Sequence, residues 1–329
     1  MKPLTYAAVF AGAIAFTSGA AMAQKVAVFA TNPQGSLGYV TGVAVAKTVT
    51  AKADGVTGRP RPMGGSTTYI PIVNRGEVDF GFSNGLETYF AYTGTGTFEG
   101  RAHPNLRLVG RMFPLRTGMV TVDDFGVRHV KDLAKLKGKR ITSEYTSLSI
   151  IQTFLEGALA NAGMSYDDFT KVPVSGFAKG MFALGEGKTD ITWISLGSGA
   201  GRKVNTQLRS RGGFTYIGMD TSPDAVARFK KIMPAAEIVL EKNTKMPGIK
   251  EPTHIVQIDY VAFTHKDMDP EVVYKVTKAL ASNKAHLEKS MGAFKRTKTP
   301  QFGEPNMAPY HPGAIKALDE LGIKVGNRG

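Results

Sequence analysis

The sequence predicts an α/β protein of two lobes that enclose a cleft. Short β-branched runs alternate with helix-length segments along most of the 329 residues, which is typical of a mostly parallel sheet covered by helices. A strand–Ser/Thr–helix unit follows residue 24 and a similar unit restarts at residues 140–162, which indicates a second lobe. Ligands of open α/β sheets bind beyond the carboxyl ends of the strands, so the cleft is the expected binding site.

The expected elements follow one another in regular order. Strands are predicted at residues 25–30, 78–82, 106–110, 118–122, 140–143, 190–194, 214–217 and 255–264. Helices are predicted at residues 38–53, 67–75, 130–136, 148–162, 176–184, 224–232, 270–290 and 313–321. The helix over 148–162 has the clearest pattern, because its apolar residues recur at i, i+3 and i+4 and Gly163 ends the run.

The lobe boundaries are placed where the chain is expected to cross between the two units. The crossing is predicted near residues 118–123 and the return near residues 255–264. The first lobe would then contain residues 24–118 and 262–329, and the second lobe residues 119–261.

The first 23 residues have the features of a secretory signal. Lys2 provides a short positive segment, residues 7–16 are apolar, and Ala21-Met22-Ala23 is the small-x-small pattern that signal peptidase accepts. Cleavage after Ala23 and a periplasmic location are therefore expected. The apolar run is shorter than the roughly 20 residues of a spanning helix, and no later segment is apolar enough, so no stable membrane insertion is expected.

Composition excludes several function classes. There are 41 Lys and Arg against 27 Asp and Glu, six His and no Cys, with a net charge of +14. The absence of cysteine excludes a disulfide scaffold and a cysteine nucleophile, and the His residues form no metal-binding motif, so no metal or cofactor is expected. The basic residues are scattered without interleaved aromatic residues, which argues against nucleic-acid binding and favours small anionic ligands.

One motif is compatible with an enzyme. Residues 81–85, Gly-Phe-Ser-Asn-Gly, match the G-x-S-x-G pattern in which Ser83 would be a nucleophile. A hydrolase also needs an acid and a histidine, and none of the six histidines has a flanking pattern that marks it. The favoured interpretation is a strand-end turn whose Ser83 and Asn84 offer hydrogen bonds to a ligand, so no enzyme is expected and a secreted serine esterase stays the alternative. A second glycine-rich segment, 197–201, is predicted to be a flexible turn.

Three helix starts are the strongest functional signal. Residues 35–39, 64–69 and 145–149 each place Gly, Ser and Thr before or at a predicted helix N-terminus. Free backbone N–H groups and the positive end of the helix dipole favour a carboxylate or phosphate there. Each hydroxyl alone is explained by a role as an N-cap. Together, if they converge on the cleft, they would clamp a small anion.

The order of several short motifs identifies a family that the chain resembles. The motifs lie at residues 35–42 (G-x-x-G-Y-x-x-G), 64–66, 74–81, 130–133, 136–140, 146–149, 187–190 and 311–314 (His-Pro-Gly-Ala). They resemble the TAXI-type solute-binding proteins of TRAP (tripartite ATP-independent periplasmic) transporters across essentially the whole mature chain. The resemblance implies a type II periplasmic-binding-protein fold, whose two α/β lobes close on a small organic anion and deliver it to an ion-gradient-driven TRAP permease.

The resemblance also implies a set of ligand-binding residues. They are Ser36, Leu37 and Tyr39 in the first loop, Ser66, Thr67 and Thr68 in the second, and Thr146, Ser147 and Ser149 in the second lobe. Asn84, at the turn after a strand, and Trp193, at a strand end where a core position is equally compatible, complete the candidates. Arg116 has the chemistry to pair with a carboxylate, but nothing in the sequence places it in the cleft.

Two departures from the family pattern bear on the ligand. Phe113-Pro114-Leu115 stands where many members have Tyr-Pro-Glu, and residues 145–149 are bulkier than the family's glycine-rich run. Members are associated with glutamate, 2-oxoglutarate and related carboxylates, and these departures favour a less polar carboxylate. A binding protein of an ABC or tricarboxylate importer shares the fold and stays the alternative.

Overall fold

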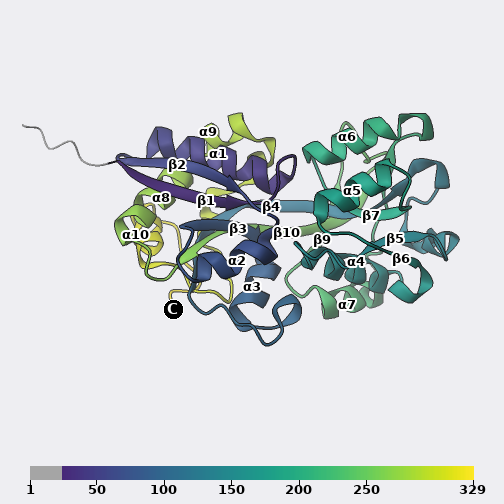
Figure 1. Cartoon of the computed structure of the whole chain (residues 1–329), viewed down its shortest axis with the longest axis horizontal. Helices are drawn as coiled ribbons and strands as arrows, with labels where there is room; N and C mark the ends of the chain where they lie inside the picture. Colours follow the sequence, from purple (N-terminus) through teal and green to yellow (C-terminus); the bar gives the residue numbers. More distant parts are fainter. Residues whose placement is uncertain (1–23) are drawn as a thin grey trace, which may run out of the picture.

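The computed structural model describes residues 24–329, so the predicted signal segment lies outside the described residues. Two long strands, β4 (Leu106–Val122) and β10 (Thr253–His265), run side by side through the middle of the molecule and join its two ends (Figure 1). None of the helices within residues 24–329 has the length and apolar character needed to cross a bilayer.

The first end of the molecule is built from both ends of the described chain. Its strands are β1 (Lys25–Thr31), β2 (Val56–Pro62) and β3 (Phe80–Asn84). Its helices are α1 (Leu37–Lys52), α2 (Ser66–Asn74), α3 (Gly85–Thr93), α8 (Pro270–Ser282), α9 (Lys284–Ser290) and α10 (Pro312–Glu320).

The second end is built from the middle of the chain. Its strands are β5 (Arg140–Ser143), β6 (Thr170–Pro173), β7 (Ile191–Ser195), β8 (Phe214–Tyr216) and β9 (Glu237–Glu241). Its helices are α4 (Ile150–Asn161), α5 (Phe177–Gly185), α6 (Gly199–Gln207) and α7 (Pro223–Ile232).

All strands belong to one mixed sheet. Its order is β2-β1-β3-β10-β4-β7-β5-β6, with β8 paired to β4 and β9 paired to β10. The outer strands pair in parallel, but β4 and β10 run antiparallel to every neighbour. The expectation of a mostly parallel sheet therefore holds for the outer parts only, because the chain crosses the molecule twice in opposite directions.

Two hydrophobic cores occupy the two ends. The first draws on residues 27–115 and 260–325, and the second on residues 119–258 together with Leu86. The cores change over between Leu115 and Met119 on β4 and between Ile258 and Tyr260 on β10. The division into lobes at residues 118 and 262 stays a prediction, and below we call the two ends the first and second lobe.

Several predicted elements differ from the structure. Residues 106–110 and 118–122 belong to the single strand β4, and residues 270–290 divide into α8 and α9 at Asn283. Strand β2 escaped prediction because its two prolines are tolerated only at a sheet edge, where it lies. Residues 197–201 are not a flexible turn: Ser198 caps α6, its Oγ accepting a hydrogen bond from the Gly201 N–H at 3.1 Å.

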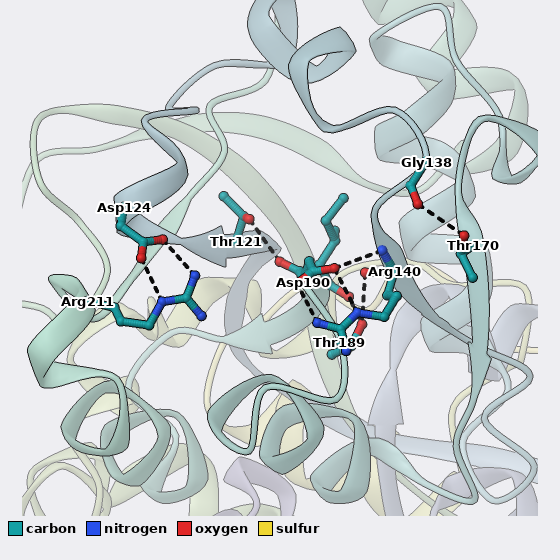
Figure 2. Close-up of polar contacts among 9 residues, drawn as sticks. Thr121, Asp124, Gly138, Arg140, Thr170, Thr189, Asp190 and Arg211 are labelled. Atoms are coloured by element: carbon teal, nitrogen blue, oxygen red, sulfur yellow. Dashed lines mark hydrogen bonds and ion pairs between the residues drawn. The ribbon is translucent and has the colours of Figure 1, made fainter.

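An ion pair ties the strands of the second lobe together (Figure 2). The Asp190 carboxylate accepts hydrogen bonds from the backbone N–H, Nε and Nη2 of Arg140 at 3.0, 3.0 and 2.8 Å. The Thr121 hydroxyl donates to the Asp190 carbonyl at 2.8 Å, and the Thr189 hydroxyl to the Arg140 carbonyl at 3.0 Å. These contacts hold β4, β5 and the start of β7 in register.

Candidate functional site

A narrow cavity of about 30 Å³ lies between the lobes. Its walls have different chemistry. The first lobe contributes the polar side chains, namely Asn32, Ser36, Ser66, Ser83, Asn84 and Tyr260. The second lobe contributes mainly apolar ones, namely Leu148, Ile150, Ile151, Phe154 and Phe177, with Ser195 as its polar group. The chemistry of the lining matches a ligand with one polar end and an apolar body, and because the cavity is small, the lobes must separate to admit one.

The N-terminus of α1 opens directly into the cavity. Ser36 is its N-cap: the Ser36 Oγ accepts from the Tyr39 N–H at 3.1 Å and donates to the Pro33 carbonyl at 2.6 Å. Leu37 and Gly38 also line the cavity. Their N–H groups belong to the first helical turn, which has no intrahelical acceptor, so this end of α1 offers donors and a positive dipole to the cavity.

Two further hydrogen-bond donors lie beside Gly38, at the N-terminus of α1. The position that a Cβ atom would take on Gly38 is 2.8 Å from the Tyr260 hydroxyl and 2.9 Å from the Asn32 Nδ2, so both groups lie against the helix end. Asn32 is oriented by Tyr69, whose hydroxyl donates to the Asn32 Oδ1 at 3.1 Å. Within the described part of the chain, the buried Tyr260 hydroxyl has no hydrogen-bond partner. Burial and the nearby charge of Glu87 hold the pKa of Tyr260 above its ordinary value, so the hydroxyl keeps its proton and can donate it.

The N-terminus of α2 is already occupied by one of the protein's own carboxyl groups. The Ser66 hydroxyl donates to Glu87 Oε2 at 2.5 Å, and the Thr67 hydroxyl donates to Glu87 Oε1 at 3.2 Å. Asn84 caps α3 with its Oδ1, which accepts from the Glu87 N–H at 2.9 Å, while its Nδ2 donates to Glu87 Oε2 at 3.3 Å. Burial raises the pKa of Glu87 to about 7, despite the opposing hydrogen bonds from Ser66 and Thr67.

The two lobes touch each other around the cavity. The Ser149 N–H donates to the Thr67 hydroxyl at 3.2 Å, and the Ala200 N–H donates to the Gly35 carbonyl at 3.1 Å. Gly65 packs so closely on the Ser147 carbonyl that a methyl group there would lie 2.1 Å from the oxygen. The two lobes are therefore in direct contact beside the cavity.

The loop before α4 has an unusual backbone at this interface. Glu144 and Tyr145 have φ angles of 68° and 39°, a left-handed conformation that non-glycine residues rarely adopt. The buried Tyr145 hydroxyl bonds to Thr142 and, at 3.1 Å, to Thr192, which holds the loop in place. The strained turn delivers Leu148 and Ile150 to the cavity wall.

Six of the predicted site residues lie at the cavity or where the two lobes meet. Ser36, Leu37, Ser66 and Asn84 line the cavity, while Thr67 and Ser149 bond to each other where the lobes meet. That any of them contacts a ligand stays a prediction.

The remaining predicted residues use their polar groups within the protein. The Thr68 hydroxyl donates to the Gly65 carbonyl at 2.6 Å, and the Thr146 and Ser147 hydroxyls donate to the Ser175 carbonyl at 3.1 and 2.8 Å. Tyr39 does not line the cavity, and its N–H is taken by the Ser36 cap. That these residues contact a ligand stays a prediction.

Trp193 belongs to the core of the second lobe. Its side chain is fully buried, packs on Phe154 with ring centroids 5.5 Å apart, and is absent from the cavity wall. Of the two placements that the sequence left open for this residue, the structure shows the core. Its neighbour two residues along β7, Ser195, reaches the cavity instead.

Arg116 faces away from the cavity. Successive residues of a strand point to opposite faces, and Leu115 lines the cavity, so Arg116 lies on the other side of β4. There its Nη1 pairs with Glu241 at 2.7 Å and its Nε donates to Gln257 at 3.3 Å.

The predicted site did not include Asn32, Ser195 or Tyr260, and Gly38 was named only as part of the motif at residues 35–39. Asn32 lies directly after β1, so its position at a strand end was a usable signal. Tyr260 lies in the middle of β10, more than 200 residues later, and only the packing of β10 beside β3 brings it to α1.

The environment of Ser83 does not resemble that of a nucleophile. Its hydroxyl pairs with the Thr88 hydroxyl at 2.6 Å and donates to the Asn84 carbonyl at 3.2 Å, and neither partner is a general base. Within residues 24–329, no three His, Asp or Glu side chains gather closely enough to hold a metal ion.

Solved structures share this fold at low sequence identity. The periplasmic binding protein BugD is 14% identical, with 92% of this chain and 99% of BugD covered and a TM-score of 0.57. MatC from Rhodopseudomonas palustris with bound malate is 12% identical, with 91% and 97% covered and a TM-score of 0.57. The binding protein component of an ABC phosphonate transporter from Pseudomonas aeruginosa is 11% identical, with 84% and 80% covered and a TM-score of 0.53.

These comparisons confirm the type II periplasmic-binding-protein fold that the resemblance implied. BugD and the protein from Pseudomonas aeruginosa are both described as binding proteins. The model of the NMT1-like family matches residues 29–322. Because this match spans nearly all of the described residues, the chain belongs to the NMT1-like family.

Proposed function

We propose that the chain is a solute receptor that holds a small organic anion with an apolar body between its lobes and presents it to a membrane permease. One observation carries the proposal: the Tyr260 hydroxyl, the Asn32 amide and the α1 N-terminus converge on one point, opposite an apolar wall. Helix N-termini and uncharged donors hold carboxylate and phosphonate groups without a basic side chain.

The charges around the cavity narrow the ligand class. No Lys, Arg or His is among the described residues that line the cavity, and the Glu87 carboxyl group accepts a hydrogen bond from Ser66 in its wall. A second negative charge on the ligand would have no partner in a buried site. A monocarboxylate with a branched or aromatic body therefore fits better than a dicarboxylate or an amino acid.

Known ligands of proteins with this fold support an anion. MatC is described with bound malate, and another match belongs to a phosphonate transporter. The absence of a basic side chain from the cavity wall here favours a less charged ligand than malate.

For the membrane partner, we propose a TRAP permease reached from the periplasm after cleavage behind Ala23. This rests on the ordered motifs that resemble TAXI-type proteins. An ABC or tricarboxylate importer is the second candidate, favoured by the likeness to a component of an ABC phosphonate transporter. Adjacent permease genes of the TRAP type support the first candidate, and an adjacent ATPase gene supports the second.

A thermal-shift screen tests the receptor proposal. Isovalerate, 4-methylvalerate, benzoate and phenylacetate are compared with succinate, malate, glutamate and methylphosphonate. A ligand at 100 times its Kd adds about 2.7 kcal/mol to the free energy of unfolding, so at least one monocarboxylate should raise the Tm by several degrees. A flat response to all eight compounds contradicts the receptor proposal, and a response to the dianions alone contradicts the ligand class.

Tyr260→Phe separates ligand binding from stability. The lost hydroxyl has no hydrogen-bond partner among the described residues, so the Tm without ligand should stay constant or rise slightly. The affinity for the monocarboxylate should fall about tenfold, because one hydrogen bond to the ligand contributes about 1–2 kcal/mol. Tyr69→Phe is the matched control: its hydroxyl bonds to Asn32 and to the Phe82 carbonyl, so its loss should lower the Tm. Unchanged affinity in Tyr260→Phe would remove this donor from the site.

A further inference from the structure

A carboxyl group lies buried directly behind the polar wall of the cavity. Glu87 is fully buried in the first turn of α3, and only Ser66 and Asn84 separate it from the cavity that they line. Its two carboxyl oxygens receive hydrogen bonds from Ser66, Thr67 and Asn84. Across residues 24–329, no Lys, Arg or His forms an ion pair with Glu87, so an ionised Glu87 is balanced by neutral donors alone.

The other titratable groups near Glu87 do not compensate its charge. Tyr69 of α2 and Tyr260 of β10 face it, and burial together with Glu87 itself raises the pKa of both, so both stay neutral. Asp259 of β10 lies on the opposite face of the strand and pairs with Arg111. On α4, across the interface, Glu156 accepts a hydrogen bond from Gln152 at 3.0 Å, and β3 carries no titratable residue.

The ionisation of Glu87 decides what Ser66 offers to the cavity. An ionised carboxylate only accepts hydrogen bonds, so the single hydroxyl proton of Ser66 is committed to Glu87 at 2.5 Å and a lone pair is left for the cavity. A protonated carboxyl group donates its own proton to the Ser66 Oγ. The Ser66 proton is then free to turn into the cavity and donate to an anion.

We infer that Glu87 couples ligand capture to the uptake of one proton, because an anion in the cavity is held more tightly when Ser66 can donate to it. The proton comes from solvent, resides on Glu87, and leaves with the ligand. The inference rests on the proposed function, and it makes Glu87 a positioning residue that acts on the ligand through Ser66. A bound anion and an ionised Glu87 would be two like charges in one buried site, which acts in the same direction.

The coupling between ligand binding and the protonation of Glu87 would operate near neutral pH. Burial raises the pKa of Glu87 from 4.5 to about 7 in the ligand-free protein. The folded protein then binds more protons than the unfolded chain between these values, so its stability should fall as pH rises from 4.5 through 7. A bound anion raises the pKa further, and above pH 7 the affinity should fall about tenfold per pH unit until the pKa of the complex is reached.

Calorimetric titration of the full chain with the four monocarboxylates of the screen tests the coupling. Their carboxyl groups have pKa values near those of Asp and Glu, about 4, and stay ionised from pH 5.5 to 8.5. Two buffers with different ionisation enthalpies give the number of protons taken up per ligand. For the wild type we expect net proton uptake at pH 7.5 and an affinity at least tenfold weaker at pH 8.5 than at pH 5.5.

Three variants complete the test. Glu87→Gln should bind without proton uptake, keep its pH 5.5 affinity at pH 8.5, and lose the fall in Tm with rising pH. Ser66→Ala should bind weakly at both pH values, because the donor is lost in either state. Glu156→Gln, a neutralised carboxyl group on a neighbouring helix, should behave like the wild type.

The outcomes separate the two proposals. Wild-type binding without proton uptake and with equal affinity from pH 5.5 to 8.5 overturns the coupling and leaves the receptor proposal intact. Failure of all four monocarboxylates to bind at any pH overturns the receptor proposal and the coupling with it. The wild-type proton count does not depend on whether any variant folds.

Discussion

Gly65→Ala is expected to prevent the lobes from closing and to weaken ligand binding by about 10- to 100-fold, the effect of roughly 1–3 kcal/mol of overpacking. The added methyl group would lie 2.1 Å from the Ser147 carbonyl oxygen. That oxygen is backbone from the opposite lobe, so no side-chain rotation relieves the clash and the lobes must separate. Gly65 has an extended backbone with φ 164°, which alanine also adopts, so the first lobe itself should fold normally.

Affinity for the monocarboxylate and the radius of gyration in solution measure this effect. The variant should have weak affinity and the larger radius of an open form, with a far-UV circular dichroism spectrum like that of the wild type. Gly64→Ala is the matched control, because its methyl group would lie 3.5 Å from the nearest atom, an ordinary contact distance. If Gly65→Ala binds and scatters like Gly64→Ala, the contact between Gly65 and Ser147 does not govern closure.

Asp190→Asn is expected to lower the free energy of unfolding by about 2 kcal/mol at pH 7. The Asp190 side chain is 10% exposed and accepts three hydrogen bonds from Arg140, but the Arg140 side chain is 43% exposed, so the loss should be smaller than for a fully buried pair. Asparagine would keep one acceptor oxygen and turn an amide donor toward the guanidinium. Urea denaturation measures the loss.

The matched control for this prediction lies in the same view (Figure 2). Arg211 donates to both oxygens of Asp124 at 2.6 and 2.9 Å, but both side chains are about 40% exposed. Asp124→Asn should therefore cost less than about 1 kcal/mol. Equal losses in the two variants would show that burial does not distinguish the pairs.

The effect of Asp190→Asn should depend on pH in a defined direction. Partial burial raises the pKa of Asp190, but the hydrogen bonds and charge of Arg140 outweigh it and the net pKa is lowered from 3.8. The stabilisation is then present above pH 3.8 and is lost as pH falls through the lowered pKa. The difference between wild type and variant should disappear in strongly acidic solution.

Much of the fold could be predicted from local patterns. The strand over 140–143 was predicted with its observed bounds, and the helix over 148–162 exceeds α4 by two residues at its start and one at its end. The left-handed conformation of Glu144 and Tyr145, in the loop before α4, has no signal in the sequence pattern. Strands β6 and β9 were not predicted. They are short, lie at the sheet edge or off its main path, and are largely exposed, so their sequences lack the apolar pattern of a buried strand.

The candidate site divides in the same way. Ser36 was predicted from a local rule, since a serine before an apolar helix caps it whatever surrounds it. Tyr260 could not be predicted as a site residue, because in the sequence it is one of several aromatic and aliphatic residues of a strand. Its hydroxyl comes to lie beside α1 only through the packing of β10 in the folded protein.

The sequence by itself determined the two-lobed α/β architecture and the helix starts with their Ser and Thr hydroxyls, because periodicity and capping act over a few residues. Only the tertiary structure decided which hydroxyls remain free for a ligand. Each hydroxyl has one proton to donate, and acceptors within the protein compete with a ligand for it. The Ser175 carbonyl accepts hydrogen bonds from Thr146 and Ser147, and the Glu87 carboxyl group accepts one from Ser66. These competitors are 20 to 30 residues away in the chain and become neighbours only when each lobe folds.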